Sequence, residues 1–396
     1  MSPLFRKILG INWVVAITMI GLMIFGIFAI YSAAYGDPAV EDQEFWRKQI
    51  KWIIVGTPIF LITSLVDYRW IRYLALPAYL GAMGLLLALP FIGKTLNGAT
   101  SWIMIGSNSI QPSQIALISG VLVLSVTLGE LHRLHPVFRN HMLRMAISLG
   151  LVAIPMALVL KEPDMGSASV WGPMTAFMLL VANIPFRYLT VLTLLALIAM
   201  PLVYWFGLKP HQKPRIQVLI QALKGEELDT RGDAFSSVRL MMAIGSAGWE
   251  GKGHKGSRIK AKNPDAKTMS ELGLVDSEPD LSDFIFGTIG EEHGFRGSMI
   301  MITAFLLLLL QCLYIGFYSR DQTGRLLVTG AVSILFWHVF MNIGMCIQIV
   351  PITGVPLPFV SYGGTFVVTC MFLMGLVESV WIHRNEEIGS EKSIFY

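Results

Sequence analysis

The chain has 396 residues, of which 54% are hydrophobic and 14% are charged, and its formal net charge is +4. Soluble proteins carry roughly a quarter charged residues, so this composition excludes an ordinary soluble protein of the same length. The small positive charge does not indicate nucleic-acid binding, because the basic residues lie mostly in short segments between apolar runs.

Ten apolar runs, several of them near the length that crosses a bilayer, occur along the chain. They lie at residues 12–34, 52–66, 73–92, 112–129, 145–160, 165–182, 186–206, 283–317, 325–350 and 365–382. The first run is too long for the apolar part of a cleavable signal peptide, so we expect it to stay in the membrane. The pattern predicts an all-α polytopic membrane protein in which residues 1–396 form one ten-helix domain.

The basic residues predict the orientation of these spans. With the N-terminus inside, the short outer loops hold only Arg47, Lys48, Lys51, Lys94 and Lys161. The short inner segments then hold Arg6, Lys7, Arg69, Arg72, Arg133, Arg139, Arg144, Arg187, Arg320, Arg325, Arg384 and Lys392. Short cytoplasmic loops are enriched in lysine and arginine. We therefore expect both termini to be cytoplasmic.

One long polar segment, residues 207–282, separates spans seven and eight and falls outside in this topology. Connections of this length are usually either functional or disordered. The piece from Ala234 to Ile244 is amphipathic, with Phe235, Val238, Leu240, Met241 and Ile244 available for an apolar face. Such a helix either lies along the membrane surface or packs on the bundle.

Ionisable residues at membrane depth are rare and mark candidate sites. Asp283 opens the predicted span eight, and at 100° per residue a stripe of glycines follows it along one helix face, at positions 287, 290, 294 and 297. Asp283 is thus either a catalytic carboxylate or one that interacts with its own helix dipole. Glu291 and Glu292 point elsewhere, and Glu292 precedes Arg296 by four residues, which favours an ion pair.

Two further clusters combine polar groups with helix breakers. Glu162 and Asp164 flank Pro163 in a very short outer turn, where Asp164 is either a site residue or the cap of span six. The segment 351–358 contains three prolines and a glycine and cannot form a regular helix, and Ser361 and Tyr362 follow it. Irregular backbone at membrane depth either lines a cavity or is buried in protein.

Two other patterns are weaker. Residues 251–256 match G-x-G-x-x-G, but no βαβ unit surrounds them, so we predict no nucleotide cofactor. His338 and Asn342, about one helical turn apart in span nine, are expected to be polar packing residues.

Taken together, these segments resemble the SEDS family, the family of RodA and FtsW. The resemblance rests on residues 243–253, 282–294 and 354–364, with weaker matches at residues 97–99, 111–113, 163–166, Gln212 and Arg215. It covers the whole chain and implies a bacterial inner-membrane enzyme that polymerises lipid II outside the membrane, with a class B penicillin-binding protein as partner. Gly251-Lys252-Gly253 favours the RodA branch, which acts in cell elongation and rod shape.

The resemblance also implies roles for individual residues. Asp283 would be catalytic, either deprotonating the acceptor sugar hydroxyl or holding a divalent cation, Mg²⁺ or Mn²⁺, at the diphosphate. The residues expected to bind substrate are Lys213, Arg215, Lys252, Asp164, Ser361 and Tyr362, and the three basic ones would pair with diphosphate oxygens.

Four positions depart from the family pattern. Ser101 replaces an arginine, Gln114 and Leu117 replace a glutamate and a lysine, and Leu281 replaces a histidine. Losing the glutamate and the lysine together avoids leaving one buried charge unpaired, which would cost roughly 3–5 kcal/mol. These departures keep open a non-catalytic scaffold for the penicillin-binding partner. The same membrane architecture also leaves open a lipid II flippase, for which Glu291, Glu292 and Arg296 would lie near the middle of the membrane.

Overall fold

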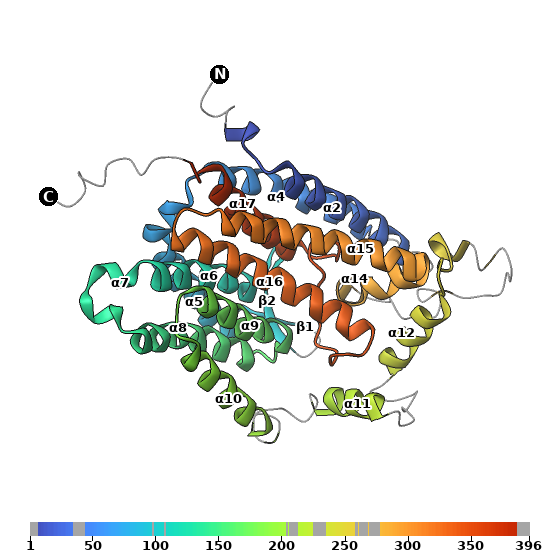
Figure 1. Cartoon of the computed structure of the whole chain (residues 1–396). Coiled ribbons are helices and arrows are strands. Elements are labelled where there is room, and N and C mark those ends of the chain that lie inside the picture. The colour runs from blue at the N-terminus through green and yellow to red at the C-terminus, as the bar shows by residue number, and fades with distance from the viewer. Residues whose placement is uncertain are drawn as a thin grey trace.

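A computed structural model describes residues 7–34, 44–96, 99–106, 108–202, 205, 213–224, 235–257, 260, 268 and 278–385. Ten long helices correspond to the ten predicted spans (Figure 1). They are α2 (Trp13–Ala33), α4 (Phe45–Leu65), α5 (Ile71–Ile92), α6 (Pro112–Gly129), α8 (His141–Lys161), α9 (Met165–Val181), α10 (Phe186–Leu202), α15 (Ile285–Phe317), α16 (Gln322–Cys346) and α17 (Gly364–Ile382). The chain is a multi-pass membrane protein whose long, apolar elements are all helices.

Seven of these helices are long and apolar enough to cross a membrane by length and composition alone. The others are α9 and α10, with 17 residues each, and α4. Helix α4 begins at Phe45, whereas the apolar run predicted a start at residue 52. Its first turns carry Arg47 and Lys48, whose cations lie over the rings of Trp46 and Phe45, 5.0 and 4.7 Å from the ring centroids. A search for apolar runs therefore misses a helical turn that carries charged residues of this kind.

Shorter elements connect the long helices. They are η1 (Tyr68–Trp70), α7 (Leu131–Leu134), η2 (Pro136–Arg139), α11 (Lys213–Lys224), α12 (Phe235–Ser246), η4 (His254–Gly256), α14 (Glu278–Asp283) and the strands β1 (Lys94–Leu96), β2 (Ala99–Ile105) and β3 (Asn108–Ile110). Helix α12 confirms the predicted amphipathic helix: Val238 and Leu240 are buried, and the helix packs on α15. Met241, expected on the same face, is exposed.

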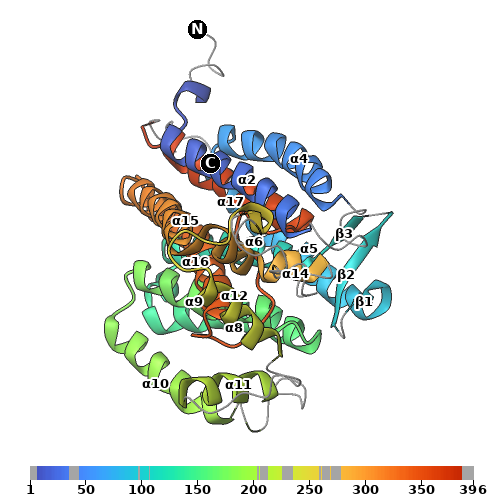
Figure 2. The same ribbon diagram turned by 90° about the vertical axis from the view of Figure 1, so that its right-hand side faces the viewer.

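The described ends of the chain lie at one end of the bundle. Lys7 Nζ is 2.8 Å from His383 Nε2, and the backbone N–H of Asn12 donates to Glu378 Oε2 at 2.9 Å. Helix α2 therefore begins beside the end of α17, as an even number of spans requires. Helices α12 and α14 lie at the opposite end, which faces the viewer in Figure 2.

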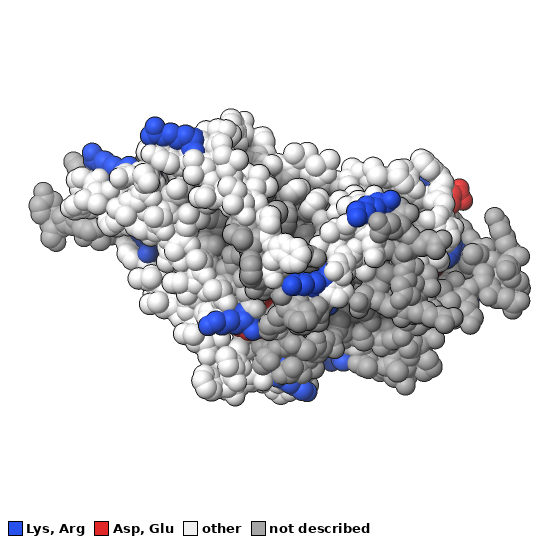
Figure 3. Space-filling view, turned by 90° about the horizontal axis from the view of Figure 1, so that it is seen from below, with Lys and Arg blue, Asp and Glu red and all other residues white. Residues whose placement is uncertain are grey.

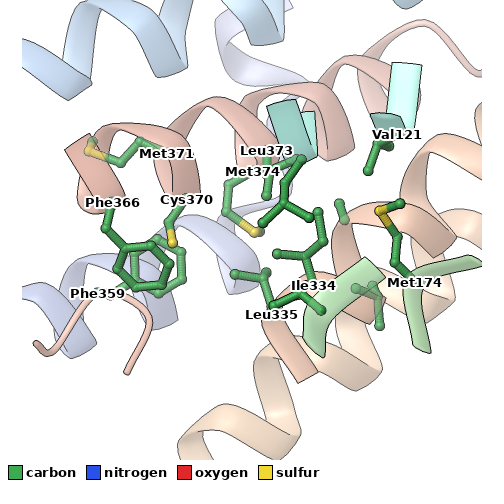
Figure 4. Close-up of a cluster of buried hydrophobic side chains, with 14 of the residues drawn as sticks. Val121, Met174, Ile334, Leu335, Phe359, Phe366, Cys370, Met371, Leu373 and Met374 are labelled. Atoms are coloured by element: carbon green, nitrogen blue, oxygen red, sulfur yellow. The ribbon is translucent and has the colours of Figure 1, made fainter. Parts of the chain in front are cut away.

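The core lies between α6, α9, α16 and α17. The most apolar stretch of α6 is 83% buried, against 28% for α8 and for α15, so α6 is central and the other two face outward. Val121, Met174, Ile334 and Met374 meet in this core (Figure 4). The outward helices expose large apolar side chains, and the face bearing α10 and α11 shows only scattered charged residues among the described ones (Figure 3). A surface of this kind suits lipid contact.

The three strands form an antiparallel sheet of order β1-β2-β3, which the prediction of helices alone missed. Ile103 pairs with Ile110 and Lys94 with Trp102. The Asn97-Gly98 pair is a typical hairpin signal, but the strands are too short to stand out in a sequence dominated by membrane spans. Thr365 Oγ1 donates to Ser109 O at 2.9 Å, which places the sheet beside the start of α17.

The predicted single helix over residues 283–317 is wrong, because two breaks interrupt it. Phe284, with φ −108° and ψ 16°, separates α14 from α15, and Gly294 inside α15 has φ 63° and ψ −161°. The segment 248–253 docks at the second break: the amides of Phe295 and Arg296 donate to the carbonyls of residues 248 and 249. The amides of residues 252 and 253 donate to the carbonyls of residues 291 and 292. The continuous glycine stripe therefore does not form.

We expect Gly294→Ala to lower the free energy of unfolding by roughly 3 kcal/mol, because a side chain disfavours this backbone conformation. The added Cβ would also overlap the amide nitrogen of Gly251. Gly172→Ala is the matched control, since it lies inside α9 with open space around its Cα and alanine favours helix. Melting temperatures in detergent test this, and equal melting temperatures for the two variants would contradict the break as described.

Candidate active site

Three of the predicted clusters meet at the end of the bundle opposite the described chain ends. Gly354, in the proline-rich break, has φ 71°, and a Cβ built on it would lie 3.0 Å from Asp283 Oδ2. The Asp283 carboxylate therefore rests against the backbone of Gly354. Gly166, in the first turn of α9, contacts the break from another side. A Cβ built on Gly166 would lie 2.8 Å from Thr353 O and 2.9 Å from Gly354 O. The break thus lies between Asp283 and the α8–α9 turn.

Asn342 and Ser361 fix the backbone that carries Asp283. Asn342 Nδ2 donates to Asp283 O at 2.9 Å and to Val355 O at 2.7 Å. Ser361 Oγ donates to Ser282 O and accepts from the N–H of Leu357. Both side chains join the end of α14 to the break. The prediction of Asn342 as a packing residue missed this role, although a buried amide in an apolar span was a signal for it.

Ser361 and Tyr362 follow the break and are both buried. Ser361 is 1% exposed with its hydroxyl engaged, and Tyr362 is buried with its ring 4.9 Å from that of Phe45. Gln49, also buried, donates from Nε2 to Ser361 O and accepts from the N–H of Gly363. In this structure the two predicted substrate-binding residues are therefore buried, and Ser361 holds the backbone of Ser282. Gln49 was not predicted, because its helix was expected to begin later.

Asp164 caps α9, which confirms the capping alternative. Its Oδ1 accepts from the N–H of Ser167 at 2.9 Å, and its Oδ2 accepts from Gln111 Nε2 at 2.9 Å. The side chain is half-buried at the lip of the turn. Both carboxylate oxygens thus have partners, and a ligand at Asp164 would compete with Gln111.

Glu162 is the second carboxyl of this turn, and it is buried at 7% exposure. Burial and the nearby Asp164 charge raise the pKa of Glu162 from its ordinary value of 4.5 to about 8. Its Oε2 has no hydrogen-bond partner among the described residues. Ser101 Oγ lies 3.5 Å from Glu162 O, so the position where the resemblance predicts an arginine adjoins this turn and brings no positive charge.

We expect Glu162→Gln to change the pH dependence of stability. Between about pH 4.5 and 8 the unfolded chain ionises at this residue while the folded chain keeps its proton. Folding stability should therefore fall as pH rises through this window, by roughly 3 kcal/mol. The variant has no carboxyl group to ionise at this position, so it does not lose this stability. Its melting temperature should be close to that of wild type at about pH 5 and higher than that of wild type at about pH 9. Melting curves across pH test this.

The exposed carboxylate Glu44 provides the control, because Glu44→Gln is the same change of side chain without the removal of a buried carboxyl. A melting-temperature difference between Glu162→Gln and wild type that stays constant with pH would contradict the raised pKa.

Of the three basic residues predicted to bind substrate, Arg215 contacts the break. Its Nη1 donates to Ile352 O at 3.2 Å, and the side chain is exposed. Lys213 Nζ donates to Trp205 O at 3.3 Å. Lys252 differs most from the prediction: its Nζ is 2.7 Å from Glu291 Oε1, and the two side chains are 10% and 2% exposed. Its ammonium group is thus paired with a carboxylate inside the protein, and its binding of a diphosphate stays a prediction.

Glu292 also differs from its predicted pairing. Its carboxylate accepts from Ser32 Oγ and from the N–H of Lys255, and it lies 3.6 Å from His254 Nδ1. Arg296 lies beyond the break at Gly294, so the predicted helical ion pair does not form within the described part of the chain. Glu291 and Glu292 together hold the segment 252–255 and the end of α2 against α15.

The remaining departures from the family pattern are buried. Gln114 and Leu117 on α6 are 2% and 0% exposed, and Leu281 on α14 is 0% exposed. A lone charge at position 114 or 117 would therefore be buried, as the argument for a paired loss requires. Their energetic coupling stays a prediction.

The described residues contain no group of three or more His, Cys, Asp or Glu side chains that could hold a metal ion. A divalent cation shared between Asp283 and the diphosphate of the substrate needs fewer protein ligands, and it stays a prediction.

Comparison with known proteins decides the family. The model of the FtsW/RodA/SpoVE cell cycle protein family matches residues 12–386. The chain belongs to this family. It is 29% identical over 371 residues to the peptidoglycan glycosyltransferase MrdB of Escherichia coli K12, covering 93% of this chain and 92% of that protein. It is 27% identical over 447 residues to the peptidoglycan glycosyltransferase RodA of Treponema pallidum, covering 95% and 98%.

Solved structures of similar fold cover nearly the whole chain. A chain from a peptidoglycan synthase complex matches with a TM-score of 0.76 at 22% identity, over 95% of this chain and 99% of its own. The crystal structure of RodA from Thermus thermophilus matches with a TM-score of 0.66 at 22% identity, over 95% and 98%. At this identity these two matches establish the fold of the family and no more.

Proposed function

We propose that this family member is a peptidoglycan glycosyltransferase that polymerises lipid II, with Asp283 as its catalytic residue. The observation that carries the proposal is the placement of Asp283. Its backbone is fixed by Asn342 and Ser361, its carboxylate lies against the Gly354 backbone, and the exposed Arg215 contacts the same break two residues away. The names of the full-length relatives support the same reaction.

In the proposed reaction, Asp283 accepts the proton of the acceptor sugar hydroxyl as that oxygen attacks the anomeric carbon of the donor sugar. The bond from that carbon to the diphosphate oxygen breaks, and the lipid diphosphate leaves with the bonding electrons. Arg215, held at Ile352 O, is placed to stabilise the charge that develops on the diphosphate. No step is assigned to a metal ion.

The distribution of basic residues predicts the orientation of the protein in the membrane. With both termini in the cytoplasm, Asp283 lies at the outer end of the bundle in the bacterial inner membrane, where lipid-linked sugars are polymerised. We further propose a class B penicillin-binding protein as partner and a role in cell elongation, as in the RodA branch. Gly251-Lys252-Gly253 favours that branch, although a relative named probable peptidoglycan glycosyltransferase FtsW, from Geobacter metallireducens, is 28% identical.

A non-catalytic scaffold for the same partner is the second candidate. The observations that favour it are Ser101, Gln114 and Leu117, which lack the charges of the family pattern, and the neutralised Lys252. A flippase is less well supported, because the buried Glu291 is paired with Lys252 and Glu292 with groups of the segment 254–255.

Polymerisation of lipid II by the purified full-length protein tests the proposal, alone and with a class B penicillin-binding protein. We expect long glycan strands, measured by gel electrophoresis of labelled product. Absence of product with the cognate partner, with and without added Mg²⁺ or Mn²⁺, would overturn the enzyme and favour the scaffold.

A further inference from the structure

Gln348, just after α16, combines two unfavourable features. It has φ 55°, a left-handed conformation that a residue with a side chain rarely adopts. It is also 8% exposed, and neither its Nε2 nor its Oε1 has a hydrogen-bond partner among the described residues. The left-handed φ belongs to the end of α16, because the N–H of Ile349 donates to Gly344 O and the N–H of Gln348 donates to Met345 O, as in a Schellman helix cap. Buried amides are normally paired, so it is the side-chain amide that lacks an explanation.

The amide faces a small cavity beneath α11. The cavity measures about 10 Å³, and Val350, Pro351 and Ile352 line it with Gln348 from one side. Arg215, Val218 and Leu219 of α11 line it from the other. This volume holds about one water molecule and no larger group. A ligand could therefore reach Gln348 only if α11 moves away, which breaks the contact between Arg215 Nη1 and Ile352 O.

The cavity adjoins the candidate active site. Ile352, which accepts from Arg215, is two residues from Gly354, against which the Asp283 carboxylate lies. Two residues of extended chain span at most about 7 Å. Ile352, which lines the cavity, therefore lies within about 7 Å of the glycine that the Asp283 carboxylate contacts.

We propose that Gln348 binds a secondary amide of the substrate, in a subsite that α11 covers when it is docked. The side-chain amide offers a carbonyl acceptor beside N–H donors, which matches the N–H and C=O of a secondary amide in two hydrogen bonds. An anionic group would use the donors alone and leave Oε1 unpaired. This inference rests on the proposed function, whose substrate carries such amides in two places: the acetamido groups of its sugars and the peptide bonds of its stem.

Equilibrium binding of fluorescent lipid II to the full-length protein tests the subsite, with Asp283→Asn as the background so that substrate is not consumed. We expect Gln348→Leu, which keeps the size but loses the hydrogen bonds, to raise Kd about tenfold or more. Gln348→Gly should raise Kd similarly while melting at or above the temperature of the parent, because glycine relieves the left-handed φ. Gln217→Leu, on the exposed face of α11, is the matched control and should bind as the parent does.

Two substrate analogues identify the source of the amide. One is lipid II with free amines in place of its acetamido groups, and the other is lipid II without its stem peptide. The analogue that lacks the bound amide should bind equally to the Gln348→Leu variant and to its parent. If Gln348→Leu and Gln348→Gly leave Kd for lipid II unchanged, or if neither analogue cancels the effect, the subsite is overturned. If the parent does not bind lipid II at all, the proposed function falls with it.

Discussion

Asp283→Asn should abolish glycan polymerisation, lowering the rate by at least about 100-fold, which is the contribution expected of a general base. Asparagine keeps the size of the side chain, and the hydrogen bonds from Asn342 and Ser361 go to the backbone of residues 283 and 282, which the substitution does not change. The melting temperature and binding of the penicillin-binding partner should therefore stay near those of wild type. Strand length and initial rate on labelled lipid II measure the effect.

Asp67→Asn provides a matched control, because Asp67 caps η1 before α5, away from the site. It should polymerise lipid II as wild type does. Activity in Asp283→Asn equal to that of the control would remove Asp283 from the catalytic role. Loss of activity accompanied by a fall in melting temperature would instead assign Asp283 to the structure of the α14 end.

Lys252→Met should be among the most destabilising single substitutions in the chain. It leaves the Glu291 carboxylate, 2% exposed, without the ammonium group that lies 2.7 Å away. Removing one partner of a buried ion pair costs roughly 3–5 kcal/mol, because the remaining charge is buried and uncompensated. Combining Lys252→Met with Glu291→Gln removes both charges, so the double variant should recover much of the lost stability.

A double-mutant cycle on melting temperature separates this structural role from the substrate-binding role that the sequence suggested for Lys252. Strong coupling between the two substitutions is expected for a pair in contact. Additive effects on stability, with a loss of lipid II binding in Lys252→Met alone, would instead show that the lysine serves the diphosphate. Lys260→Met, in the same loop region, serves as a control for removing one positive charge.

The break at Gly294 explains why this pair forms. A regular helix would satisfy its own carbonyls at residues 291 and 292, but the break leaves them to the amides of Lys252 and Gly253. That docking carries the Lys252 side chain to Glu291 and brings Lys255 to Glu292. The glycines of the segment 251–253 thus serve close backbone packing on α15, and the basic residue between them is drawn into the protein interior.

The positions of the ten spans and the irregular backbone at residues 351–358 could be predicted from the sequence, and the catalytic role of Asp283 stays a prediction. Each of these depends on local chemistry: the length of an apolar run, the cost of a carboxylate at membrane depth, and prolines that cannot complete a helix. The family pattern then covered nearly the whole chain and agrees with the matched family.

The partners that these residues take depend on how distant segments of the chain pack together. Lys252 pairs with Glu291, and Asn342, Ser361 and Gln49 hold the backbone of the site. The amide of Gln348, beneath α11, has no partner among the described residues. These outcomes depend on contacts between segments tens to hundreds of residues apart, which hydropathy and helical periodicity do not encode. The packing of one helix end against another loop sets them, and in a membrane protein that packing depends on close backbone approach and hydrogen bonds more than on apolar burial.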